Sequence, residues 1–108
     1  MIATLNIGLN NNPYGYGEVI DLLQNKFDVL WHTQANGQYD GEVEPTVVVL
    51  IDSDYAHTSH FIKLIEQLAT VLTQNCIAVS THQFDILVYS QNYKGERYKF
   101  NPKYFIEI

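Results

Sequence analysis

The densest group of residues able to do chemistry is the segment Asp52–His60, which brings carboxylates and imidazoles together. It follows an apolar run and precedes a helical pattern, and sites on α/β scaffolds often lie at such a junction. Asp52, Asp54, His57 and His60 are therefore candidate ligands of zinc or another divalent cation, or acid–base groups of a small enzyme. The spacing lacks the His-Glu-x-x-His pattern. Capping of a helix and solvation explain the same residue types, so both interpretations stay open.

The second candidate is the loop after the first apolar segment. Asn11, Asn12, Tyr14 and Tyr16 supply hydrogen-bonding groups and stacking faces just before a predicted helix, where backbone amides point outward. The glycines around Tyr16 do not complete a dinucleotide-binding pattern, because the third glycine position holds Ile20. We expect these four side chains to bind a small ligand. The alternative is a surface loop whose tyrosines pack on the helix.

Other reactive side chains form no recognisable catalytic motif. Cys76 is the single cysteine and is expected in the core, and no family signature pairs it with His82. Asp40, Glu42 and Glu44 lie in a polar turn region, where carboxylates are usually solvated. No serine lies in a Gly-x-Ser-x-Gly pattern. The sequence favours a non-catalytic protein without a cofactor.

The charge of the chain narrows the classes of partner. The formal net charge is −6, and residues 1–90 carry two lysines against ten acidic residues. This excess of negative charge disfavours binding to nucleic acid, because affinity for nucleic acids comes largely from lysine and arginine side chains that neutralise phosphates. In residues 93–100, lysine and arginine residues alternate with aromatic residues. This pattern fits a β-hairpin better than a surface that binds single-stranded nucleic acid. With no apolar run of about 20 residues and no signal-peptide pattern, we expect a cytoplasmic protein that does not enter a membrane.

Hydrophobic periodicity indicates the elements that must position these residues. Alternation predicts strands, three-and-four spacing predicts helices, and Asn36-Gly37 and Asp40-Gly41 each predict a hairpin turn. The run 46–51 reads as a strand buried on both faces. The expected strands are 3–10, 29–34, 46–51, 76–80 and 84–90, and the expected helices are 18–27 and 59–74.

The order of these elements predicts an α+β fold, a ferredoxin-like βαββαβ plait with a C-terminal β-hairpin extension. We expect a single domain over 1–108, with the plait core in 1–90 and the extension in 91–108. Two helices would cover one face of the sheet and leave the other bare.

Three strings carry a resemblance to known proteins: Gly8-Leu9-Asn10-Asn11-Asn12-Pro13-Tyr14, residues 42–49 and residues 74–79. Over about residues 5–80 the chain resembles small uncharacterised proteins of bacteriophages and mobile elements. The resemblance implies a plait-like fold, a phage or bacterial cytoplasmic setting, and an accessory or counter-defence role. It brings no active-site residues with it.

These observations favour a non-catalytic binding module that takes a protein partner or a small ligand. The alternative is the small metal-dependent or acid–base enzyme at Asp52–His60. A bare sheet face or edge, and the aromatic residues of the C-terminal extension, predict a homo-oligomer, most simply a dimer.

Overall fold

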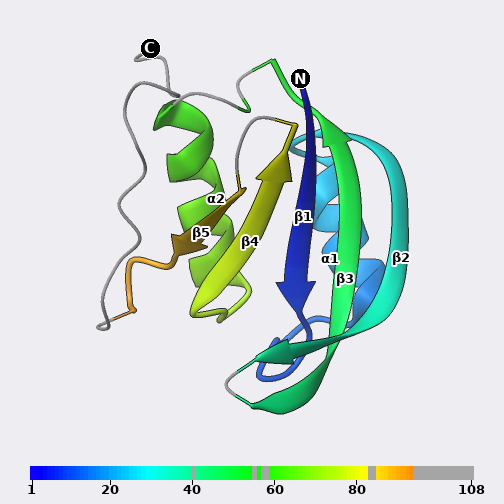
Figure 1. Cartoon of the computed structure of the whole chain (residues 1–108), viewed down its shortest axis with the longest axis vertical. Coiled ribbons are helices and arrows are strands. Elements are labelled where there is room, and N and C mark those ends of the chain that lie inside the picture. The colour runs from blue at the N-terminus through cyan, green and yellow to red at the C-terminus, as the bar shows by residue number, and fades with distance from the viewer. Residues whose placement is uncertain (40, 55, 57–58, 83–84, 94–108) are drawn as a thin grey trace.

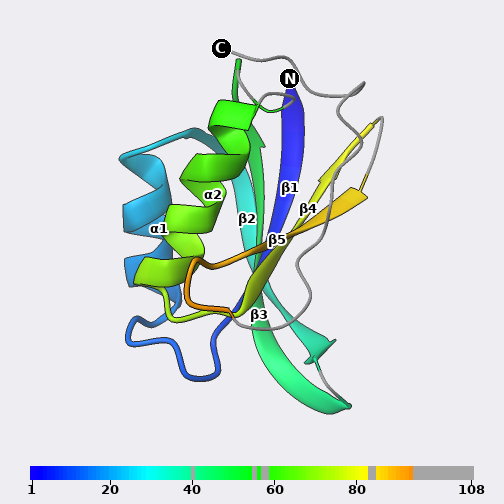
Figure 2. The same cartoon turned by 90° about the vertical axis from the view of Figure 1, so that its left-hand side faces the viewer.

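The computed structural model describes residues 1–39, 41–54, 56, 59–82 and 85–93. Its five strands form one antiparallel sheet in the order β2-β3-β1-β4-β5 (Figure 1). Both helices lie on the same face of this sheet (Figure 2), which confirms the α+β prediction. The elements are β1 Ile2–Gly8, α1 Tyr16–Gln24, β2 Asp28–Tyr39, β3 Glu42–Asp52, α2 Ser59–Val71, β4 Cys76–Thr81 and β5 Asp85–Tyr89.

Alternation of buried and more exposed residues, clearest in β3, separates a helix-covered face of the sheet from an open face. In β3, Val47, Val49 and Ile51 are fully buried, whereas Val48 and Leu50 are only partly buried. The prediction that this strand is buried on both faces is wrong, since no described element covers its second face. The unbroken β-branched run reflects a preference for the pleated strand conformation rather than burial on two sides.

The apolar faces of the two helices close the core. Helix α1 lies against β2, and α2 lies over β4 and β5 (Figure 1). Phe27, after α1, meets Phe61 of α2 edge to face with ring centroids 5.9 Å apart. Helix α2 ends at Val71, before the predicted Gln74, because Thr73 adopts a left-handed backbone with φ of 54°.

The strands β2 and β3 form a longer hairpin than the sequence indicated. Asn36 and Gly37 lie inside β2, paired with Pro45 and Glu44, so the turn predicted at Asn36-Gly37 is wrong. The chain reverses near Gly41, whose φ of +79° suits glycine. Beyond the end of β1, the described strands leave β2 and β3 paired with each other alone, and this β2–β3 ribbon curls toward the open face (Figure 2).

The last described strand confirms the one predicted over 84–90. Its Tyr89 stacks on Tyr93, with ring centroids 4.5 Å apart. The rest of the predicted extension, from residue 94 onward, lies outside the described residues. In the described part of the chain, no helix is long and apolar enough to cross a membrane.

Candidate binding site

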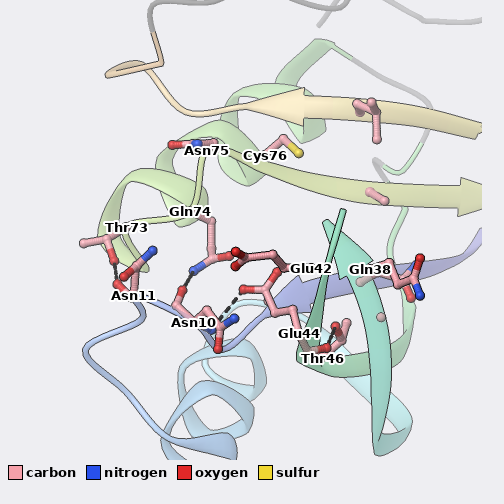
Figure 3. A pocket seen from close by; sticks show the side chains of 15 residues that line it. Asn10, Asn11, Gln38, Glu42, Glu44, Thr46, Thr73, Gln74, Asn75 and Cys76 are labelled. Carbon is pink, nitrogen blue, oxygen red and sulfur yellow. Dashed lines mark hydrogen bonds between the residues drawn. The ribbon is translucent and has the colours of Figure 1, made fainter. Parts of the chain in front are cut away.

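A pocket of about 490 Å³ opens on the uncovered face, where β1 ends beside the β2–β3 ribbon and the junction of α2 with β4 (Figure 3). Segments far apart in the sequence therefore meet here. Most of the side chains that line it are amides, carboxylates and hydroxyls. These polar residues are Asn6, Asn10, Asn11, Gln38, Glu42, Glu44, Thr46, Thr73, Gln74 and Asn75. The rest of the lining is Cys76, Gly8, Gly37, Ala78 and Leu87.

The carboxylate of Glu44 lies against the backbone of the neighbouring strand β1. A Cβ atom at Gly8 would overlap all three atoms of this carboxylate, so the carboxylate occupies the space that the glycine leaves open here. One oxygen, Oε2, accepts a hydrogen bond from the backbone N–H of Asn10 at 3.0 Å. The next residue on the same face, Thr46, donates its hydroxyl to the Glu44 carbonyl at 2.9 Å. Glu44 is thus held at both its backbone and its side chain.

The opposite wall is held by the residues that follow α2. Gln74 is 8% exposed, and its amide nitrogen donates to the carbonyls of Asn10 at 3.2 Å and Leu72 at 3.3 Å. The hydroxyl of Thr73 donates to the carbonyl of Asn11. These bonds tie the loop after β1 to the segment between α2 and β4, and so hold two walls of the pocket together.

The described residues that line the pocket carry a net negative charge, which comes from two carboxylates. Glu42 and Glu44 are two residues apart on β3 and therefore project from the same face of the strand. Figure 3 shows both side chains reaching into the hollow toward Asn10 and Gln74. Among the described lining residues there is no lysine, arginine or histidine to offset the two carboxylates. A cleft with one sign of charge concentrates ligands of the opposite sign.

Cys76 lies in this pocket as a half-buried free thiol. Burial, and then the nearby Glu44 carboxylate, raise the pKa of Cys76 above its ordinary value. A raised pKa keeps the group as the weakly nucleophilic thiol at neutral pH. His82 follows the far end of β4, about 20 Å away by strand geometry, and so does not act as its base.

We therefore expect alkylation of Cys76 by iodoacetamide to have its pH midpoint above that of the same chain unfolded in urea. Glu44→Gln removes one of the two causes of the raised pKa, so it should move the midpoint to lower pH without reaching the unfolded value. Mass spectrometry of timed samples measures both profiles. Identical midpoints in the two folded proteins would contradict the placement of Glu44 beside the thiol.

The predicted ligand loop contributes only one of its four residues to this pocket, Asn11, which has a left-handed φ of 59°. Asn12 closes the loop on itself: its Nδ2 donates to the Gly8 carbonyl at 3.3 Å, and its Oδ1 accepts from the Tyr14 N–H at 2.9 Å. Tyr14 and Tyr16 are partly buried against the core. The hydroxyl of Tyr16 also hydrogen-bonds His32 Nδ1 on β2.

Asp52, the first residue of the segment Asp52–His60, ends β3 at the end opposite to Glu42 and Glu44, and no described residue of the segment lines the pocket. The Asp52 carboxylate accepts a hydrogen bond from the amino group of Met1 at 3.0 Å. Asp54 is exposed, and His57 lies outside the described residues. Within the described ranges, no three His, Cys, Asp or Glu side chains cluster closely enough to hold a metal ion.

The sequence prediction missed Glu44, Gly8 and Gln74. The one local signal concerned Gly8, because a glycine in a strand often marks the close approach of another group. Comparison of the chain with protein-family models, curated proteins and solved structures finds no match.

Proposed function

We propose that the protein is a non-catalytic binding module whose pocket takes a positively charged group of a partner protein or small ligand. The observation that carries this proposal is the fixed carboxylate of Glu44 against Gly8 and Asn10. A guanidinium or ammonium group is the chemical class that fits, because it can donate several hydrogen bonds while it neutralises the carboxylates.

The surroundings of Glu44 support a cation over a neutral ligand. Oε2 already accepts the Asn10 amide, and an ionised carboxylate offers about four acceptor positions on its two oxygens, so acceptor capacity remains for a ligand. Glu42 adds a second negative charge at the pocket. Partial burial of Glu44 strengthens its attraction to a cation, because the effective dielectric constant near a protein surface is well below that of water.

The pocket has the features of a binding site more than those of a catalytic one. Its nucleophile is held as a thiol, and its described lining offers no imidazole to activate it. The alternative enzyme at Asp52–His60 gains no support from the described geometry, since His57 lies outside the described residues.

We further propose that the fold is the ferredoxin-like plait. The order β4-β1-β3-β2, with helices after β1 and β3, supports this proposal, and β5 is then an addition at the β4 edge. We also propose that the protein is a small accessory protein of a phage or of the bacterial cytoplasm. In this proposal it acts in counter-defence and assembles as a homo-oligomer.

A titration with N-acetylarginine amide and N-acetylcitrulline amide tests the proposed function. The two probes have nearly the same shape, but only the first is charged. Calorimetry should detect saturable binding of the arginine derivative and at least tenfold weaker binding of the citrulline derivative. Equal affinities, or no binding of either probe, would overturn the cation proposal.

A further inference from the structure

Strand β2 forms an edge of the sheet, because its one described neighbour is β3. It is twelve residues long, Asp28–Tyr39, and from Val29 to Tyr39 it has no charged residue and no proline. Leu30 and Trp31 are 48% and 54% exposed on this strand. A long, uncharged edge with exposed apolar side chains is a template for pairing with another strand.

The protections that usually block such pairing are missing over most of β2. Edge strands are commonly short, charged, interrupted by proline or bulged. The strand at the other end of the described sheet, β5, has five residues and begins with Asp85. In β2 the one irregularity in pairing lies between Val29 and Trp31, and the register with β3 is regular from Trp31 to Tyr39.

We propose that β2 pairs antiparallel with β2 of a second copy of this chain, across a two-fold axis near Thr33. This inference names the surface of the homo-oligomer proposed above. Antiparallel pairing of identical strands satisfies the β2 edges of two copies with one symmetric contact, and two-fold dimers are the commonest homo-oligomers. A second copy of the chain is therefore the partner that we propose, because one contact then covers the β2 edge of each copy.

The paired segment is Trp31–Ala35, because it follows the bulge and precedes the part of β2 that curls away with the ribbon. With the axis at Thr33, Trp31 lies opposite Ala35 of the partner subunit on the open face. A large aromatic side chain then packs over a small one. The nearest charge on the strand, Asp28, lies at its start, so the net charge of −6 on each copy is not concentrated at the axis.

Light scattering at high micromolar concentration tests the association. The wild-type chain should have twice its mass of 12.4 kDa. Trp31→Lys places a charge on the edge and should yield the monomer mass, whereas Val71→Lys, an equally exposed apolar position on α2, should remain dimeric. A monomeric wild type would overturn both the oligomer and this interface. A dimer that survives Trp31→Lys would overturn the interface alone.

Cross-linking separates an edge contact from a contact through the open face. In a Cys76→Ser background, Thr33→Cys should form a disulfide-linked dimer on mild oxidation, because the two sulfurs face each other across the axis. Val48→Cys is the matched control, since Val48 pairs with Thr33 in the sheet but lies one strand inward. Cross-linking at Val48 and not at Thr33 would show packing of the open faces and overturn the edge proposal.

Discussion

Replacing Leu68 by alanine is expected to lower the free energy of unfolding by about 2–5 kcal/mol. Leu68 is 2% exposed on the sheet-facing side of α2, within the cluster formed with Phe61, Ile65 and Leu72. The loss has two parts, the transfer free energy of the missing methyl and methylene groups and the cavity that they leave. Urea denaturation followed by circular dichroism measures it, provided that the slope of the transition is unchanged.

Val71→Ala is the matched control for this prediction. Val71 lies on the same helix, three residues further on, and is 52% exposed. Surface substitutions of this kind usually change stability by less than about 0.5 kcal/mol. A Leu68→Ala effect as small as that of Val71→Ala would mean that the described packing of α2 on β4 and β5 is incorrect.

Glu44→Gln is expected to weaken binding of N-acetylarginine amide by about tenfold or more. The change keeps the shape of the side chain and its contact with Gly8 but removes the negative charge. Hydrogen bonds to charged groups contribute about 1.5–3 kcal/mol, and about 1.4 kcal/mol corresponds to tenfold in affinity. Calorimetric titration at low salt measures the difference between the two proteins.

The exposed carboxylate of Glu18 on α1 provides the control. Glu18→Gln makes the same change in net charge at a site away from the pocket, so it should leave the affinity within about twofold of wild type. Thermal denaturation of both variants separates loss of the site from loss of the fold. Equal weakening by Glu18→Gln and Glu44→Gln would indicate attraction to the overall charge rather than binding in the pocket.

Most of the fold follows from hydrophobic periodicity in the sequence. Alternation in β1 and three-and-four spacing in α2 each place most apolar residues on one face of the element. The structure buries that face in the core. The errors have local causes. Asn36-Gly37 is a strong turn signal in isolation, but the register of β2 with β3 carries both residues into a strand. The end of α2 depends on the left-handed Thr73, which helical spacing alone does not reveal.

The site was less predictable because it depends on contacts between distant segments. Glu44 looks solvated in sequence, and only the pairing of β1 with β3 puts Gly8 opposite Thr46 and leaves room for the carboxylate of Glu44. The hydrogen bond from Gln74 to Asn10 spans 64 positions. Asn11 was predicted because the loop that contains it is locally polar. Tyr14 and Tyr16 were predicted to bind the ligand for the same reason, but in the structure they pack partly against the core.

Chemical-shift mapping tests the central claim, that a cation binds beside Glu44. The ¹⁵N-labelled wild-type protein is titrated with N-acetylarginine amide, and the backbone amides are followed by two-dimensional NMR. The claim predicts saturable shifts at Gly8, Asn10, Glu44 and Cys76, with little change at the same amides in Glu44→Gln. Saturable shifts confined to other parts of the chain, or shifts of the same size in the variant, would contradict it.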